Sequence, residues 1–426
     1  MSTATRRSDK WVGLVATPRA GRTNLGMLLV IVMAVWPKVA EATTELPAPY
    51  DARSAAMGGS GVAHVHNGAS VYHNPAALHE VKGLVATVSL SPAITGQSAP
   101  VEGPGMTRSA DSGLVPLFLV GAAYRVAERL VFGAAYYQTG GFGATYKNIA
   151  AYGGLDLKGQ VGISEFSPVV TYSILSNLAV SVGYRLTVVS EKMTMPTVPP
   201  GGSTPVAAES DLSGVSPFGL QAGVYYRPIE RLRLGAVYRS KVTTDLSGTT
   251  TVAGAKMDTS SKMSCPHGFK VGAAVDVIPD KLLLALDLKY LLYGESSKEM
   301  VTKTTTPAGE VTTTTQRLDW KDAISGYFGA EYMVTSKFPI RVGYEFTTTA
   351  TPTSRPNPLM MPPGIVHGPT AGAGLHLSHL AFDLGVSYSW GSKDVAASDL
   401  AVDAGVAPGK YSTTLLIIAA SATYQM

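Results

Sequence analysis

The sequence predicts an all-β protein, a 14-stranded antiparallel transmembrane β-barrel with a small N-terminal helical hatch, or plug, in its lumen. Three observations lead to this prediction: an N-terminal export signal, a two-residue alternation of apolar and polar side chains, and links between strands that are alternately short and long. The composition agrees, because 45 Gly and 20 Tyr with only 15% charged residues favour many thin strands over a large soluble core.

Residues 1–42 have the form of a secretory signal peptide. Basic residues from Arg6 to Arg22 precede the apolar run Leu25 to Trp36, and Ala40-Glu41-Ala42 has the small-x-small pattern of a cleavage site. A single anchoring helix is the alternative, but a membrane span needs about 20 apolar residues, more than this run provides. An exported chain without a longer apolar run can enter a membrane only as a closed β-barrel.

Charge and cysteine content exclude several function classes. Six of the 34 basic residues and two of the 30 acidic ones precede residue 43, so the rest of the chain carries equal numbers of both. The basic balance therefore belongs to the signal and gives no case for nucleic-acid binding. Cys265 is the one cysteine, so no internal disulfide exists, and its position is wrong for a lipoprotein anchor; we expect a packed or loop thiol.

The predicted hatch covers residues 43–83, a Gly-rich stretch without strand alternation. Its most informative part is the tripeptide Asn74, Pro75 and Ala76. Pro75 biases Asn74 away from helical backbone angles, and Asn followed by Pro is typical of the N-cap and first position of a helix. We expect a short helix over roughly residues 76–81, just before the barrel, which covers residues 84–426.

The strand evidence is a period of two. From Leu380 to Trp390 the even positions are apolar or aromatic and the odd positions small or polar, and the same alternation recurs in Leu282 to Tyr290 and in Leu178 to Val188. In a soluble sandwich the apolar face would cover a core, whereas in a membrane barrel it would face lipid. The alternation alone leaves both possibilities open.

The lengths of the links favour the barrel. Links after even-numbered strands are tight, as at Ser176-Asn177 and Pro279-Asp280, and links after odd-numbered strands are much longer, which is expected of outer-membrane barrels. Both termini then lie on the short-turn side, so the hatch is periplasmic. Long links such as Thr302–Thr315 and Met195–Pro205 are rich in Thr, Pro and Gly, and we expect solvent-exposed loops there. The predicted strands are 84–92, 114–125, 130–142, 159–175, 178–192, 214–228, 231–246, 262–278, 281–294, 317–334, 338–349, 369–377, 380–391 and 411–426.

Five segments in a specific order resemble the FadL/TodX family of outer-membrane transporters for long-chain fatty acids and other hydrophobic molecules. These segments are Gly58–Ala77, Tyr238–Val242, Trp320–Asp322, Arg341–Tyr344 and Tyr411–Met426. The resemblance implies a monomeric channel in the outer membrane of a Gram-negative bacterium, without a cofactor. Its substrate would be captured near the extracellular loops, move to a site inside the barrel and leave sideways into the membrane where the third strand kinks.

Carried onto this sequence, the resemblance assigns hatch and gating residues Asn74, Pro75 and Ala76, and implies that they face the kinked strand. That strand corresponds to about Leu130 to Phe142, where Gly133, Gly140 and Gly141 are candidates for the kink. Glycine inside a strand permits a bulge or bend. The alternative is that these glycines admit close packing of the hatch, and the sequence does not separate the two.

The sequence departs from the family in two places. The chain ends in Tyr424-Gln425-Met426, whereas many outer-membrane barrels end in Phe, which bears on the efficiency of membrane insertion. The segment Met361–His367 lacks the acidic and basic residues that the family tends to carry there, so any ligand or loop contact made through it differs.

A fatty-acid carboxylate would need a cation beside an apolar channel. The alternation turns several cations inward, but they could equally pair with inward acids such as Asp287, Glu345 and Asp383, so the substrate-binding residues remain unassigned. The inward cations are Arg185, Arg227, Arg233, Arg239, Lys289 and Arg341.

Other site chemistries have weaker support. A zinc site built from the four hatch histidines lacks a cysteine or carboxylate pattern, so we expect polar hatch residues and no metal. An outer-membrane hydrolase would need a nucleophile elbow or a metalloprotease helix, neither of which occurs, so we expect no enzyme. The sequence thus favours passive uptake of hydrophobic molecules, with long-chain fatty acids first and aromatic hydrocarbons or general diffusion as alternatives. The histidines are His64, His66, His73 and His79.

Overall fold

The computed structural model describes residues 51–199 and 202–426. The predicted signal peptide, 1–42, and the first part of the predicted hatch, 43–50, lie outside these residues. Within the described part of the chain, no helix combines the length and the apolar character needed to cross a membrane.

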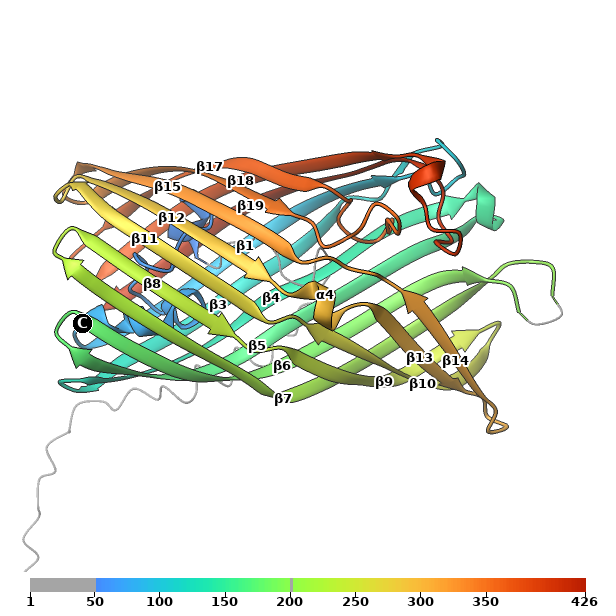
Figure 1. Cartoon of the computed structure of the whole chain (residues 1–426), viewed down its shortest axis with the longest axis horizontal. Helices are drawn as coiled ribbons and strands as arrows, with labels where there is room; N and C mark the ends of the chain where they lie inside the picture. Colours follow the sequence, from blue (N-terminus) through green and yellow to red (C-terminus); the bar gives the residue numbers. More distant parts are fainter. Residues whose placement is uncertain (1–50, 200–201) are drawn as a thin grey trace, which may run out of the picture. The chain divides into compact units, whose positions relative to one another are not determined.

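The strands form a closed, 14-stranded antiparallel barrel, as the sequence predicts (Figure 1). Closure is made by β1, which pairs with β3 on one side and with β19 on the other. Ten passes through the described wall are single strands: β1 (Leu84–Ala99), β3 (Gly113–Ala127), β4 (Leu130–Ile149), β5 (Leu155–Leu175), β6 (Leu178–Thr197), β7 (Val206–Ile229), β16 (Phe338–Thr348), β17 (Ile365–His376), β18 (Leu380–Val395) and β19 (Gly409–Gln425).

The other four passes are each divided into two strands. They are β8 (Leu232–Arg239) with β9 (Val242–Val252), β10 (Ala255–Cys265) with β11 (Gly268–Ile278), β12 (Leu282–Leu291) with β13 (Glu299–Thr305), and β14 (Val311–Arg317) with β15 (Ala323–Thr335). A one-turn helix, α4 (Tyr293–Ser296), lies in the third of these interruptions, and a short strand, β2 (Arg108–Ser109), pairs with the end of β1.

Several strands continue further than predicted. The Thr-rich segment Thr302–Thr315, expected as an exposed loop, instead forms the β13–β14 hairpin around a short turn, and β6 extends to Thr197, into the second expected loop. The physical reason is that Thr is β-branched and favours extended backbone, and hydrogen bonding to β10 continues the ladder beyond the apolar belt. The polar composition correctly predicted that the Thr-rich segment is exposed, but the prediction that it is a loop was wrong.

The exposure of the two strand faces distinguishes a membrane barrel from a soluble sandwich. On β18, Phe382, Leu384 and Val386 are 45%, 62% and 44% exposed, whereas the alternate residues Asp383 and Ser387 are buried. Apolar side chains thus cover the outside and polar ones the inside, the inverse of a sandwich that packs around an apolar core.

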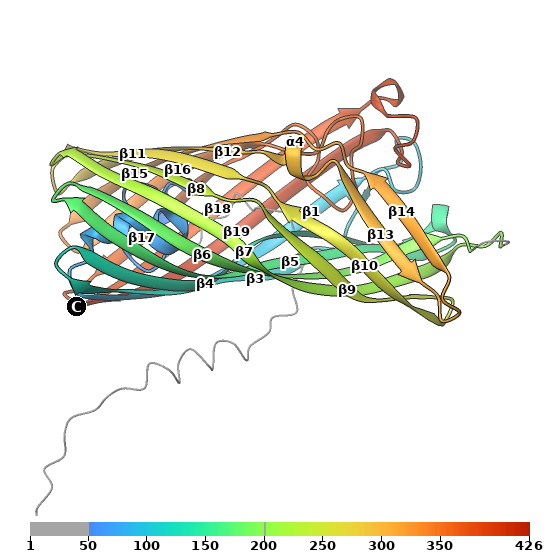
Figure 2. The ribbon, with the colours of Figure 1, turned by 60° about the horizontal axis from the view of Figure 1, so that its bottom comes forward.

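The segment before β1 folds into the barrel as three short helices, α2 (Ala52–Ala56), α3 (Ser70–His73) and η1 (Pro75–Glu80), here called the hatch. Figures 1 and 2 show it inside the barrel near the rim where the C terminus lies. Wall glycines let its backbone approach closely: a Cβ on Gly329 or Gly343 would lie within about 2.5 Å of hatch atoms at Met57. The hatch is therefore fitted to this particular wall.

Candidate functional site

Asn74 caps η1 and also binds the wall. Its Oδ1 atom accepts the backbone N–H of Ala76 at 3.1 Å, which is the predicted N-cap, with Pro75 in the first turn. Its Nδ2 atom donates to the carbonyl of Val62 and to that of Val224 in β7, both at 3.0 Å. One side chain thus joins two parts of the hatch to the barrel.

The wall contacts of the Asn74 side chain itself come from β7 and β8. A Cβ on Gly223 of β7 or Gly235 of β8 would lie 2.5 or 2.7 Å from the Asn74 amide, so these glycines form its seat. Thr171 of β5 donates to the carbonyl of Pro75 at 2.7 Å, and Ala76 packs near Tyr225. The Asn74–Ala76 element therefore faces β5, β7 and β8.

The three candidate glycines of β4 occupy two different environments. Gly133 lies in regular pairing between Ala123 and Val169, and a Cβ there would lie 2.8 Å from Leu78 of the hatch, so this glycine admits hatch packing. Gly140 and Gly141 instead follow a shift in the β4–β5 register between Gln138 and Gly140.

At this shift Thr139 is the extra residue of a β-bulge. Gly141 has φ of +152°, and a Cβ there would lie 2.1 Å from the Val161 carbonyl oxygen. Of the three glycines, Gly141 is therefore the one that the bent backbone itself requires.

The bulge coincides with an interruption of the wall between β3 and β4. Pairing of these strands ends at Leu119 and Tyr137, and in the described chain the next backbone hydrogen bond between this part of β4 and the segment preceding β3 runs from Asp111 to Thr145 at 2.8 Å. In between, residues 137–141, 143 and 144 are all buried, where a wall strand would alternate. This part of β4 lies inward of the barrel surface.

A charged cluster lies in the lumen beside the bulge. Glu165 of β5 accepts hydrogen bonds from Arg185 of β6 and Arg239 of β8, and Tyr137, which precedes the bulge, donates to the same carboxylate at 3.1 Å. The Arg239 guanidinium lies 4.8 Å from the centre of the Tyr72 ring in the hatch. We call Tyr137, Glu165, Arg185 and Arg239 the floor cluster; it links the bulged strand to the hatch.

Most other inward cations anchor structure. Arg341 pairs with Glu331 at 2.6 Å and with Asp383 at 2.7 Å, and Glu331 also binds Arg53 of the hatch at 2.7 Å. Arg227 pairs with Glu80, and Arg233 with Asp276. Structural pairing, the alternative left open by the sequence, accounts for these residues.

Asp287 and Glu345 bind groups other than those the sequence suggested. Asp287 accepts the backbone N–H groups of Gly61 and Val62 at 2.7 and 3.1 Å and pairs with Lys270 at 3.0 Å, so it holds the hatch loop. Glu345 accepts hydrogen bonds from two serines of β18, Ser387 and Ser389.

A packed cluster of buried apolar side chains lies on the lumen side of the strands next to the floor cluster. They come from β5, β6, β7, β9, β10 and the loop 349–364, and Trp320 packs against them. The single cysteine, Cys265, is a packed member of this group. We call it the apolar chamber wall: Val161, Ile163, Val189, Leu212, Leu246, Met263, Cys265 and Met360.

The loop 349–364, which supplies Met360, is fastened at its outer end. Arg355 binds Asp319 and Asp403, each at 2.6 Å. The Arg355 guanidinium lowers the pKa of both carboxyl groups, so these pairs stay charged at neutral pH. Tyr146 of β4 also donates to the Pro358 carbonyl at 2.9 Å, which holds the loop over the lumen.

A pocket of about 500 Å³ lies among the loops on the same rim. It is formed by the segments after β1, β4 and β18, and its apolar lining includes Val101, Tyr152, Leu400 and Val406. A pocket of this size suits a small hydrophobic molecule. The sequence placed these segments in loops but gave no sign that they would meet.

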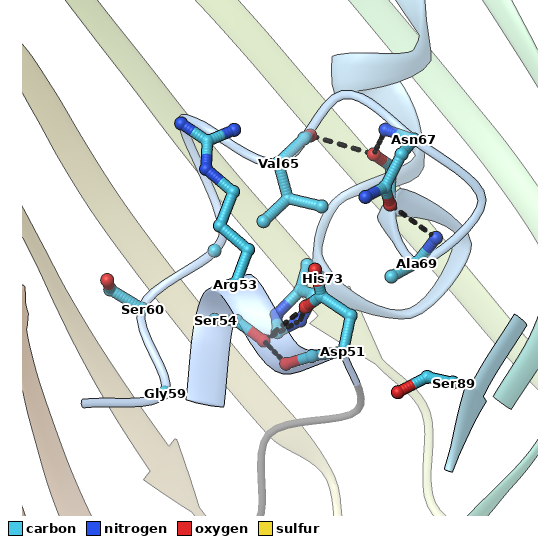
Figure 3. A network of polar contacts seen from close by, with 12 residues as sticks. Asp51, Arg53, Ser54, Gly59, Ser60, Val65, Asn67, Ala69, His73 and Ser89 are labelled. Atoms are coloured by element: carbon cyan, nitrogen blue, oxygen red, sulfur yellow. Dashed lines mark hydrogen bonds and ion pairs between the residues drawn. The ribbon is translucent and has the colours of Figure 1, made fainter. Parts of the chain in front are cut away.

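The hatch histidines contact separate partners. His73 Nε2 lies 3.1 Å from Ser54 Oγ and 3.4 Å from Asp51 Oδ1, and Ser54 donates to Asp51 (Figure 3). His64 contacts Ser60, and His79 contacts Ser173. Across the described residues, no group of three or more His, Cys, Asp or Glu side chains is arranged to hold a metal ion.

The Asp51, Ser54 and His73 trio does not have the geometry of a catalytic triad. Both the serine hydroxyl and the carboxylate meet the same imidazole nitrogen, whereas a triad places them on opposite nitrogens. Burial lowers the pKa of His73; burial raises that of Asp51, but hydrogen bonds from His73 and Ser54 outweigh this and bring it to about 2. The three side chains form a buried hydrogen-bonded group that links the start of the hatch to α3.

Comparisons with known proteins agree with the barrel fold. The sequence profile of the family described as outer membrane protein transport protein (OMPP1/FadL/TodX) matches residues 40–426. A comparison with curated protein sequences found no significant match. Among solved structures, a Pseudomonas aeruginosa FadL homologue superposes with a TM-score of 0.75 at 15% identity, over 89% of this chain and 99% of the other.

Two toluene transporters are similar in fold. TodX of Pseudomonas putida gives a TM-score of 0.71 at 15% identity, with 90% of this chain and 100% of the other covered. TbuX of Ralstonia pickettii gives 0.70 at 17% identity, with 89% and 98% covered. At these identities the likeness establishes the shared fold and leaves the substrate open.

Proposed function

The chain belongs to the OMPP1/FadL/TodX family of outer-membrane transport proteins, and we propose that it carries long-chain fatty acids passively from the medium into the outer membrane. The observation that supports this substrate is that the floor cluster lies next to the apolar chamber wall, on the side toward the hatch. An amphiphile with an apolar tail and an anionic head matches this arrangement.

The register of two adjacent strands sets the spacing. On β5, Ile163 of the chamber wall is two residues from Glu165, and on β6, Val189 is four residues, about 13 Å, from Arg185. The tail would lie along the chamber wall and the carboxylate at the guanidinium groups. Charge-assisted hydrogen bonds from arginine to a carboxylate are strong and directional.

We propose that substrate leaves between β3 and β4. Tyr137 belongs to the floor cluster and is also the last β4 residue paired with β3, so a head group at the cluster would lie beside the interruption of the wall. Capture would begin at the loop pocket on the other rim. Lateral release delivers an apolar molecule into hydrocarbon without passage through the polar hatch.

Uptake by an expression host that lacks its own transporter tests this function. Arg239→Met removes one of the two guanidinium groups and leaves Arg185 paired with Glu165, so the barrel should still fold. The affinity for fatty acid should fall at least about tenfold, and uptake at low fatty-acid concentration should fall with it. The matched control is Arg231→Met, because Arg231 is an exposed residue in the turn before β8. This variant should bind fatty acid as tightly as the wild type does.

Toluene uptake is measured in parallel, because a hydrocarbon has no head group for an arginine to hold. Toluene uptake that is efficient and insensitive to Arg239→Met, with no fatty-acid uptake, would instead identify an aromatic-hydrocarbon channel. Free passage of sugars would identify a general diffusion porin and contradict the proposal.

A further inference from the structure

One carboxyl group in the lumen has surroundings unlike those of the floor cluster. Glu191 of β6 is 4% exposed and stands directly opposite Val161 of β5 and Leu212 of β7, both members of the apolar chamber wall. Because paired residues on neighbouring strands project to the same side, its carboxyl group lies among these apolar side chains.

One carboxyl oxygen of Glu191 lacks the hydrogen bonds and ion pairs that compensate the acids of the charged clusters. Its Oε2 atom is buried and has no hydrogen-bond partner in the described structure. The adjacent cation, Lys192, belongs to the opposite face of the strand and pairs with Asp211 at 2.8 Å. By contrast, Glu165 and Glu331 each bind two arginines.

This environment determines the chemistry of the group. An isolated carboxylate in apolar surroundings is costly, so these surroundings favour the neutral acid, which offers one O–H donor. An uncharged acceptor can take this hydrogen bond without bringing an uncompensated charge into the chamber, which would be costly.

We propose that Glu191 forms an upper binding position for uncharged hydrophobic molecules that carry one oxygen atom, such as a long-chain alcohol or a phenol. The carboxyl group donates a hydrogen bond to that oxygen while the hydrocarbon part lies against the chamber wall. This inference rests on the proposed function only in that the lumen admits hydrophobic molecules.

The upper position is separate from the floor cluster. Glu191 lies six residues from Arg185 along β6, which is about 20 Å of strand. Met360 is the one chamber-wall member that comes from the loop 349–364 instead of a strand, and its flexible side chain can yield space to a ligand. Alcohols and fatty-acid anions should therefore depend on different residues.

Trp320 provides a local reporter, because it packs against the chamber wall. Trp390 lies on the outer face of β18 and is replaced by Phe to remove its signal; Trp11 and Trp36 belong to the predicted signal peptide. The purified protein in detergent is titrated with dodecanol, dodecane and dodecanoate, three ligands with one chain length and different head groups, and quenching of Trp320 is recorded.

We expect dodecanol to bind about tenfold more tightly than dodecane, the ratio that one buried hydrogen bond provides. Glu191→Leu should abolish this preference and leave dodecanoate unchanged, whereas Glu191→Gln, which keeps a neutral donor of the same shape, should retain it. Glu209→Leu, at an exposed carboxyl on β7, is the matched control and should behave as the wild type.

Equal affinities for dodecanol and dodecane, or a preference that survives Glu191→Leu in a folded barrel, would overturn the assignment. Arg239→Met separates this outcome from failure of the proposed function, since it should weaken dodecanoate and spare dodecanol. Insensitivity of dodecanoate to Arg239→Met would count against the fatty-acid site alone.

Discussion

At the scale of single residues, Asn74 shows how one side chain performs a local and a long-range task. Its oxygen caps η1, which the sequence predicts, and its nitrogen binds the wall carbonyl of Val224 at 3.0 Å, which the sequence cannot show. Close approach depends on Gly223 and Gly235, where any side chain would collide with the amide. The hatch is thus positioned by an asparagine and two glycines from distant strands.

Replacing Asn74 with Ala should reduce substrate uptake while the barrel stays folded. The change removes the cap, worth about 1 kcal/mol, together with the two bonds from Nδ2. Uptake assays and heat-modifiable migration in detergent gels measure the two effects. Asn67→Ala is the matched control, because the Asn67 side chain accepts the backbone N–H of Ala69 within the hatch. Unchanged uptake in a correctly inserted Asn74 variant would reduce this residue to a helix start.

At the scale of elements, β4 combines two functions along its length. Its first part, around Gly133, is a regular wall strand that seats Leu78, and its second part, beyond Thr139, turns inward and leaves β3. On sequence alone, Gly133 and Gly141 have the same interpretation, because a glycine in a strand is compatible with close packing or with a bend. Only the register of β4 against β5 separates Gly133 from Gly141.

Deleting Thr139 should close the wall. Without the extra residue the β4–β5 register becomes continuous, so the ladder between β3 and β4 can extend past Tyr137 and the interruption should shrink. We expect loss of fatty-acid uptake with retained ligand binding, measured by quenching of Trp320. Deleting Ala308, in the five-residue turn between β13 and β14, is the control and should leave uptake intact. Normal uptake by the Thr139 deletion would exclude release between β3 and β4.

At the scale of the whole molecule, hatch and barrel use different kinds of stability. The barrel is held by backbone hydrogen bonds between neighbouring strands, whereas the hatch is held by side chains that reach it from the wall, such as Glu331 to Arg53 and Asp287 to the Gly61–Val62 backbone. Local contacts of this type can be lost without breaking the ladder. Contacts of the hatch can therefore break while the barrel of this chain stays folded.

Acidification should loosen the hatch before the barrel. Burial lowers the pKa of His64, His66 and His73, that of His66 to about 4, whereas the unfolded value is 6.5. Between pH 6.5 and 4 the unfolded hatch binds protons that the folded hatch excludes, so hatch stability falls as the pH falls. Asp51, with a pKa of about 2, stays ionised throughout this window and retains its stabilising contribution.

Hydrogen exchange at pH 7 and pH 5, corrected for intrinsic rates, measures this effect. Hatch amides should lose protection at pH 5 while wall amides keep it. His66→Phe, which retains a ring against Tyr225, should weaken the pH dependence. Equal hatch protection at both pH values would show that the histidines do not control it.

The sequence by itself determined the barrel, the number of its strands, the inward and outward faces and the helix cap at Asn74. These features depend on residues that are neighbours in the chain, through a period of two, turn chemistry and capping. Tertiary structure alone decided that Arg185 and Arg239 share Glu165, at separations of 20 and 74 residues, and that Glu191 stands among apolar side chains. The physical reason is that barrel register brings distant strands together, and alternation gives the side to which a residue projects but not the partner it meets there.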